Sequence, residues 1–158
     1  MLIIDKINKD TIVVPLYGSN RSEVIQELLD TLVQKQYLRA SIKLFSFIDA
    51  QESEHCSTTG RGVAFPHSIS KEIEELVCIL GVSKDGIIYD KKDVHPCHIV
   101  LLSLSPINNT DAHRKFISRF RLLLSNSNLK DKIINSTSVR DVEIEIRNWE
   151  KQQIEEDI

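Results

Sequence analysis

Residues 57–67 read Ser57-Thr58-Thr59-Gly60-Arg61-Gly62-Val63-Ala64-Phe65-Pro66-His67. The two glycines permit backbone angles closed to other residues and allow a ligand to approach the main chain. Val63-Ala64-Phe65 is apolar and partly β-branched, which predicts a short buried strand. Pro66 fixes its own φ and favours extended geometry before it, so His67 leaves a rigid segment in a restricted direction. Because imidazole titrates near neutral pH, this histidine can act as a nucleophile without prior activation.

The chain has 158 residues, 41% of them hydrophobic and 27% charged, which suits a single domain over 1–158 with one core. A net charge of −3 indicates neither nucleic acid nor a membrane surface as partner. No apolar run approaches the roughly 20 residues of a membrane span. Cys56, Cys78 and Cys97 are odd in number and widely spaced, so we expect no disulfide framework and a cytoplasmic location.

Apolar patterns predict the elements, with a core over about 11–149 and a charged, frayed tail over 150–158. Strands are expected at 11–16, 63–65, 75–82 and 97–104, with a turn at 84–86 and a short strand or bulged continuation at 87–89. Helices are expected at 22–36, 41–54, 112–124, 129–134 and 138–149. The strand at 75–82 has the pattern of one buried on both faces and 97–104 is a near-continuous apolar run, so both faces need cover, and no helix separates the two strands. We therefore predict an α/β fold, a three-layer helix/sheet/helix sandwich with a mixed β-sheet.

Two of the five histidines, His67 and His113, lie in sequence contexts that favour a functional role. His67 follows the loop, the strand and the proline described above. His113 lies in the first turn of the expected helix 112–124, where the helix dipole disfavours a charged imidazole and backbone N–H groups favour an anion. The competing interpretation is that His67 is structural or solvated and that His113 is an exposed polar residue of a first turn.

Metal-ligand residue types also occur, but their spacing is poor for a closed zinc site. Cys97 and His98 are adjacent on an expected strand and point to opposite faces. We interpret them, together with His95 and the pair His55-Cys56, as packing and surface residues, and expect no metal or other cofactor. A metal-dependent hydrolase using this cluster is an alternative that metal analysis would test.

Hydroxyl and basic residues near the two histidines suit an anionic ligand. The hydroxyls of Ser57, Thr58 and Thr59 could donate to a phosphate, although ordinary turn chemistry explains them as well. Arg114 is the basic residue next to His113, and the other cations of that helix form no single stripe.

The segment Ser57-x-x-Gly60-Arg61-Gly62-Val63-Ala64-Phe65-Pro66-His67 resembles that of the IIA domains of the bacterial phosphoenolpyruvate-dependent sugar phosphotransferase system. The branch is the fructose/mannitol/nitrogen-regulatory one, and the free-standing length and Arg61 look most like the nitrogen-regulatory IIA proteins. The apolar run 101–106 followed by His113 matches the place of the family's second histidine. The resemblance covers roughly residues 11–149.

This resemblance implies a phosphocarrier with a mixed sheet between helical layers. His67 would accept a phosphoryl group from a phosphohistidine carrier of the HPr type, and His113 would stabilise the phosphoryl oxygens. The implied phosphate contacts come from Ser57, Thr59, Gly60, Arg61 and Arg114. We expect the loop Gly60–Gly62 to lie where His113 arrives. Regulatory target proteins would be further partners, and onward transfer to a sugar-transport component is left open.

The pair Gln51-Glu52 stands where the family commonly has Arg-Glu. A glutamine amide offers neither the fixed charge nor the bidentate fork of a guanidinium, so we expect a weaker phosphoryl acceptor. Arg61 or Arg114 would then be the nearest cation to offset the phosphoryl charge. Gln51 also suggests the alternative function, an IIA-like regulatory binding module that is not phosphorylated.

Overall fold

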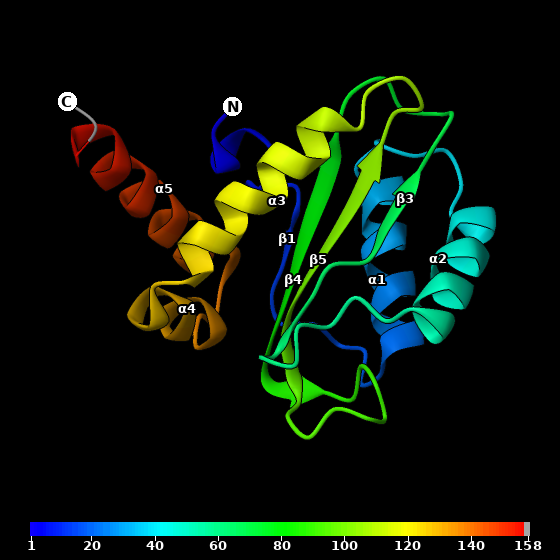
Figure 1. Cartoon of the computed structure of the whole chain (residues 1–158), viewed down its shortest axis with the longest axis horizontal. Helices are drawn as coiled ribbons and strands as arrows, with labels where there is room; N and C mark the ends of the chain where they lie inside the picture. Colours follow the sequence, from blue (N-terminus) through cyan, green and yellow to red (C-terminus); the bar gives the residue numbers. More distant parts are fainter. Residues whose placement is uncertain (157–158) are drawn as a thin grey trace.

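The structure is a computed structural model that describes residues 1–156, and it places a sheet between two layers of helices (Figure 1). Its elements are η1 (Ile3–Asp5), β1 (Ile12–Val13), α1 (Arg21–Gln34), α2 (Ile42–Glu54), β2 (Val63–Ala64), β3 (His67–Ile69), β4 (Val77–Ile87), β5 (Cys97–Ser105), α3 (Asp111–Leu124), α4 (Ser127–Ile134) and α5 (Val139–Glu156). The three-layer α/β architecture expected from the apolar strands is confirmed.

The sheet is mixed, as predicted, with the order β1-β4-β5-β2 and with β3 also paired to β5. Among the strands of the described residues, the central pair β4–β5 is antiparallel and the other three pairs are parallel. β2 and β3 follow one another along the same edge of β5, because Val63 pairs with Ile99 and His67 with Ser103. His67 therefore lies on an edge strand, toward the C-terminal end of β5.

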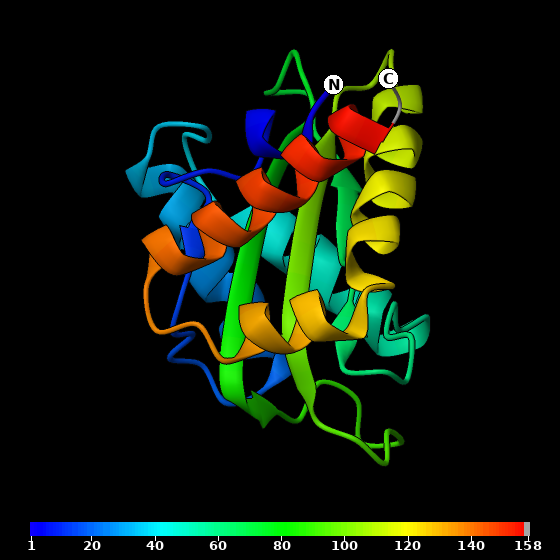
Figure 2. The same cartoon turned by 90° about the vertical axis from the view of Figure 1, so that its left-hand side faces the viewer.

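Helices cover both faces of the sheet, with α1 and α2 on one and α3, α4 and α5 on the other (Figures 1 and 2). The apolar stripe of α1 is completely buried and consists of Val24, Ile25, Leu28, Leu29 and Leu32. Each such side chain contributes roughly 1.5–3 kcal/mol when it leaves water. On the opposite face, Phe116 and Phe120 of α3 are almost completely buried. Each helical layer thus has its own hydrophobic cluster against the sheet.

β4 is longer than the sequence pattern suggested. It continues through the expected turn at 84–86 to Ile87, with a shift of register against β5 between Val82 and Ile87. Gly86 has a φ of +84°, which other residues rarely adopt, so it absorbs the irregularity. Of the expected segment 87–89, only Ile87 is a bulged continuation of β4, and Ile88 forms an isolated bridge with Asn20.

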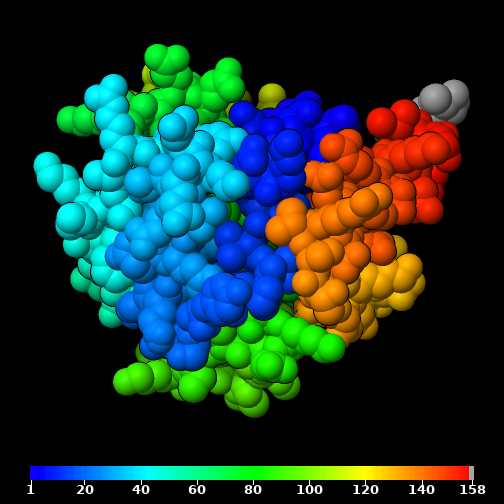
Figure 3. All heavy atoms as spheres, turned by 180° about the vertical axis from the view of Figure 1, so that it is seen from behind, coloured from blue at the N-terminus to red at the C-terminus, as the bar shows by residue number. Residues whose placement is uncertain are grey.

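The predicted frayed tail is wrong for residues 150–156, which continue α5, while 157–158 lie outside the described residues. Glu150 explains the error, because its buried carboxylate accepts hydrogen bonds from the backbone N–H groups of Ile3 and Ile4, each at 2.9 Å. Arg119 pairs with the same carboxylate at 3.1 Å. The N-terminal residues consequently lie between α1 and α5 (Figure 3), and the core begins before the expected residue 11.

Candidate active site

His67 is held by the pairing of its short strand with β5. The Ser103 N–H donates to the Pro66 carbonyl at 3.0 Å, and β3 continues in parallel register from His67 opposite Ser103 to Ile69 opposite Ser105. The proline thus fixes the chain immediately before the histidine, as the sequence suggested. The side chain is half-buried on the face of the sheet that α3 covers.

His113 stacks on His67. The two ring centroids are 3.9 Å apart and the ring planes differ by 9°. His113 comes from the first turn of α3, which begins directly after the loop that follows β5. The structure therefore brings together the two histidines that the sequence singled out, from positions far apart in the chain.

Both imidazoles are held in the neutral form. Burial lowers the pKa of His67. The pKa of His113 falls to about 4, first because of burial and second because of the neighbouring charge of His67 when that ring is protonated. Near pH 7, His67 is therefore an uncharged ring with a nitrogen lone pair available, which is the form that acts as a nucleophile.

Polar atoms around the pair are unequally satisfied. His67 Nε2 lies 3.2 Å from the Ser105 hydroxyl, whereas His113 Nε2 is buried and has no hydrogen-bond partner among the described residues. Such unpartnered buried groups are rare in folded proteins and point to a missing ligand. Sequence reasoning missed Ser105, although Ser103 and Ser105 are the polar alternation in an otherwise apolar strand and could have been noticed.

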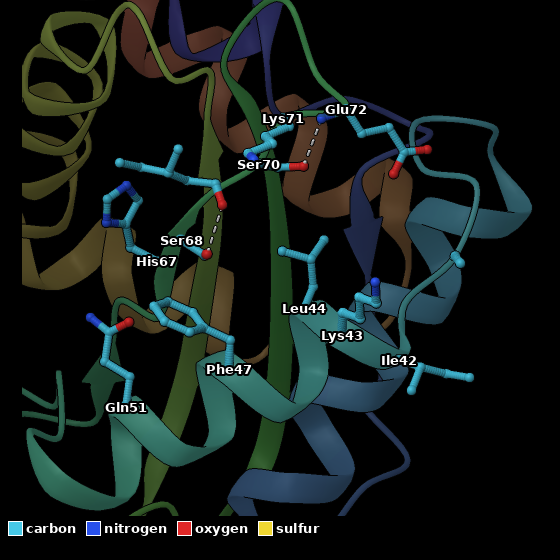
Figure 4. A pocket seen from close by; sticks show the side chains of 12 residues that line it. Ile42, Lys43, Leu44, Phe47, Gln51, His67, Ser68, Ser70, Lys71 and Glu72 are labelled. Atoms are coloured by element: carbon cyan, nitrogen blue, oxygen red, sulfur yellow. Dashed lines mark hydrogen bonds between the residues drawn. The ribbon is translucent and has the colours of Figure 1, made fainter.

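A groove of about 900 Å³ runs between α2 and β3 and reaches His67 (Figure 4). Gln51 lines the same groove from α2, so residue 51 does lie near the histidine, as expected. The walls include the exposed apolar side chains of Ile42, Phe47 and Ile69. An exposed apolar surface beside a reactive group is typical of a surface that receives another protein.

The Ser57 hydroxyl makes hydrogen bonds within the protein. Its hydroxyl donates to the buried Glu52 carboxylate at 2.7 Å and accepts from the Phe65 N–H at 3.0 Å. Glu52 also accepts from the Tyr89 hydroxyl at 2.8 Å, and burial, followed by this carboxylate, raises the pKa of that phenol. The network joins α2, the loop and the strand that leads to His67.

The expected place of the loop Gly60–Gly62 is wrong. The Gly62 carbonyl accepts from the N–H groups of His98 and Ile99, which lie at the N-terminal end of β5. Ser105, beside His67, is at the other end of that strand, roughly 20 Å away at about 3.3 Å per residue. Both glycines do adopt positive φ, of 73° and 81°. The close approach is at Gly62 alone, and it is to the Pro96 carbonyl of the protein itself.

The structure consequently does not bring Thr59, Gly60 and Arg61 to His67. Thr59 closes the tight turn by donating its N–H to Val63 O at 3.0 Å, and the Arg61 carbonyl accepts from Lys130 Nζ at 2.7 Å. Register between strands decides this separation, and register is a tertiary property that the local sequence does not contain. Arg114 follows His113 on α3, is exposed, and pairs with Asp111 at 2.6 Å.

The other histidines and the cysteines form no candidate site. His98 Nδ1 lies 2.9 Å from the Ser83 carbonyl, and Cys56, Cys78 and Cys97 are free thiols. Over residues 1–156, no group of three or more His, Cys, Asp or Glu residues is arranged to hold a metal ion. In that same part of the chain, no helix combines the length and the apolar character that crossing a membrane requires.

Comparison with known proteins defines the family. Residues 5–149 match the family model described as phosphoenolpyruvate-dependent sugar phosphotransferase system, EIIA 2. The chain belongs to this family. The resemblance drawn from the segment that ends in Pro66-His67 is thus confirmed, and the protein is a IIA component of the phosphotransferase system.

Relatives of the IIA family agree with this assignment. The fructose-specific EIIABC component of Bacillus subtilis (strain 168) is 26% identical over 148 residues, which make up 94% of this chain and 23% of that protein. The nitrogen regulatory protein IIA-Ntr from Neisseria meningitidis has a TM-score of 0.75 at 19% identity, over 87% of this chain and 93% of that one. Mannitol IIA from Escherichia coli has a TM-score of 0.73 at 16% identity, over 89% of this chain and 99% of that one.

A third structure contains a partner. It is a complex of enzyme IIA mannitol with phosphorylated enzyme IIB mannitol from Escherichia coli, with a TM-score of 0.74 at 15% identity, over 90% of this chain and 98% of the matched one. The TM-scores of these three structures, 0.73 to 0.75, establish that this chain shares the IIA fold.

Proposed function

We propose that this IIA protein is a phosphocarrier that accepts a phosphoryl group on His67 from a phosphohistidine carrier of the HPr type. The observation that carries the proposal is the stacked pair of His67 and His113, with the buried Nε2 of His113 lacking a partner within residues 1–156. A phosphoryl oxygen bound to the neighbouring ring would supply the missing acceptor. Membership of the IIA family supports the same reaction class.

The neutral state of His67 suits the transfer. A lone pair on its ring attacks phosphorus, a new N–P bond forms, and the N–P bond to the carrier breaks with its electron pair returning to the carrier's imidazole. Phosphoryl transfer passes through a loose transition state, so positioning and charge stabilisation are what the protein has to supply. His113, which is uncharged at neutral pH, would donate an N–H to a phosphoryl oxygen as negative charge arrives.

The groove beside His67 is the proposed docking surface for the carrier. It also offers a means of regulation, because a phosphorylated histidine adds roughly −1.5 to −2 charge, by analogy with phosphoserine. Placed at the end of an apolar groove, that charge would change which target proteins bind there. Onward transfer to a IIB component is the other use of the same group, and both uses place the protein in the cytoplasm.

Phosphorylation in vitro tests the proposal. The protein is incubated with phosphoenolpyruvate and the two upstream phosphotransferase proteins, and its intact mass is measured with and without acid treatment. Wild type and His95→Ala, which alters an exposed histidine, should gain one acid-labile phosphoryl group, and His67→Ala should gain none. Undiminished acid-labile phosphate on His67→Ala would show that another residue is the acceptor.

A second candidate function is a IIA-like binding module that is never phosphorylated. The neutral Gln51 beside His67, where the family commonly has a cation, favours this alternative. Wild-type protein that gains no phosphate under conditions in which the carrier itself is fully phosphorylated would support it.

A further inference from the structure

The Ser105 hydroxyl is a buried group in direct contact with the nucleophile. Ser105 is the last residue of β5 and has no exposed surface. Its Oγ lies 3.2 Å from His67 Nε2, and its carbonyl accepts from the Ser70 N–H at 2.9 Å. Because β3 and β5 run in parallel register, the backbone of Ser105 is fixed relative to the strand that carries His67, while its hydroxyl can still rotate about χ1.

The direction of this hydrogen bond follows from burial. Among residues 1–156, the one hydrogen-bond partner of the Ser105 side chain is His67 Nε2. If Nε2 carried the ring proton and donated it, the hydroxyl hydrogen of Ser105 would be buried without an acceptor, which is strongly unfavourable. The satisfied arrangement has Ser105 as the donor, a lone pair on Nε2 and the ring proton on Nδ1 of His67.

We propose that Ser105 is a positioning residue that holds His67 in the Nδ1–H tautomer and thereby makes Nε2 the nitrogen that accepts the phosphoryl group. The part concerning phosphate rests on the proposed function. In the transfer, the Nε2 lone pair forms the bond to phosphorus while the bond to the carrier nitrogen breaks. The ring keeps its Nδ1 proton, so no proton has to leave during the step. The hydroxyl, released from Nε2, then donates to a phosphoryl oxygen.

Ser103 provides a matched control. It is on the same strand and the same face, is equally buried, and has a hydroxyl that contacts the Cys78 thiol at 3.7 Å instead of the histidine. Removing that hydroxyl changes the packing of β5 in a comparable way and leaves His67 Nε2 untouched. Ser105→Thr is the conservative variant, because it keeps a hydroxyl at the position.

The first experiment measures the tautomer in the unphosphorylated protein by long-range proton–nitrogen NMR of the His67 ring. Wild type, Ser103→Ala and Ser105→Thr should show the Nδ1–H tautomer, and Ser105→Ala should shift toward Nε2–H, the form that a free histidine side chain prefers. Wild-type protein in the Nε2–H form, or an unchanged tautomer in Ser105→Ala, overturns the inference. The wild-type measurement tests the tautomer assignment even if a variant fails to fold.

The second experiment follows phosphorylation of the same proteins by the phosphorylated carrier. Ser105→Ala should accept the phosphoryl group up to about tenfold more slowly, the effect of one hydrogen bond, while Ser103→Ala should keep the wild-type rate. Phosphorus–nitrogen NMR of the wild-type product should place phosphate on Nε2. Phosphate on Nδ1 overturns the inference and leaves the proposed function standing. Absence of phosphorylation overturns the proposed function. The tautomer is then decided by the first experiment, which uses unphosphorylated protein.

Discussion

The two ends of the β5 edge differ in how completely their polar groups are satisfied. At the N-terminal end, the Gly62 carbonyl accepts two backbone hydrogen bonds and the Arg61 carbonyl accepts one from Lys130. At the C-terminal end, within the described residues, the buried Nε2 of His113 has no partner and a groove opens beside His67. A glycine-rich loop has the composition of a ligand cradle, yet here its hydrogen-bonding groups are used within the protein. The end with a missing partner is the better candidate for chemistry.

Ser57 connects the two ends. It stands at the start of the loop, and its hydroxyl bridges the Glu52 carboxylate and the backbone N–H of Phe65, two residues before the histidine. We interpret the loop as a support that fixes where the strand carrying His67 begins. This division between a supporting end and a reacting end predicts different consequences for mutations along one continuous segment.

The largest effect is expected at the reacting end. His113→Ala removes the group that would bind a phosphoryl oxygen but leaves the nucleophile, so transfer to His67 should continue at a rate lower by up to about 10²-fold. The measurement is the rate of phosphorylation by the phosphorylated carrier, with His95→Ala as the control. A His113→Ala rate equal to that of wild type would show that the unpartnered nitrogen has no part in the reaction.

At the supporting end, the expected effect is on stability. Ser57→Ala deprives the Phe65 N–H of its acceptor and the buried Glu52 of a donor, so the free energy of unfolding should fall by about 1–3 kcal/mol. Urea denaturation measures this loss, and Ser53→Ala, which alters an exposed serine near the end of α2, should lose much less. Equal stability of the two variants would mean that the network does not hold the loop.

The dependence of stability on pH also distinguishes the reacting end. The pKa of His113 is lowered to about 4 in the folded protein, from about 6.5 in the unfolded chain. Between these values the unfolded state binds more protons, so the free energy of unfolding decreases as the pH falls from 6.5 toward 4. Burial lowers the pKa of His67 and acts in the same direction.

Comparison with a variant isolates this contribution. His113→Gln removes the titrating ring, and its free energy of unfolding should decline less steeply than that of wild type over the same interval. Urea denaturation at a series of pH values supplies both curves. Identical slopes would indicate that His113 is as easily protonated in the folded protein as in the unfolded chain.

Most of the fold could be predicted because it depends on local periodicity. The apolar stripe of α1 and the apolar strands β4 and β5 identify their elements and the need for two covering layers. β3 was missed because three residues beginning with a histidine and a serine carry no periodic signal. The continuation of α5 was missed because it depends on Glu150 binding the N-terminal backbone, a contact across the whole chain.

The site was only partly predictable, because part of it depends on contacts between distant residues and not on local pattern. His67 and His113 each stand at the end of a recognisable local pattern, a strand with proline and a helix start. The positions of Arg61 and Ser105 relative to His67 depend instead on the register between the edge strands and β5. This register places Arg61 far from His67 and Ser105 beside it. A hydroxyl inside an apolar strand becomes meaningful only when its partner across the sheet is known.

The smallest effect is expected from changing the charges at the two ends, and it is the sharpest test of the difference between the reacting end and the supporting end. Gln51 lines the groove with His67, so Gln51→Arg would place a guanidinium near the phosphoryl group. Gln51 is exposed, and exposed ion pairs contribute roughly 0.2–1 kcal/mol, so the transfer equilibrium should shift toward this protein by about 1.4- to 5-fold.

Arg61 is the matched comparison from the supporting end. The sequence suggested that it offsets the phosphoryl charge, but its backbone lies beside Lys130, far along β5 from His67. Screening over such a distance leaves little interaction between exposed charges, so Arg61→Ala should keep the wild-type transfer equilibrium. The equilibrium with the phosphorylated carrier is measured for wild type and both variants at one ionic strength. A loss in Arg61→Ala with no gain in Gln51→Arg would reverse the roles assigned to the two ends.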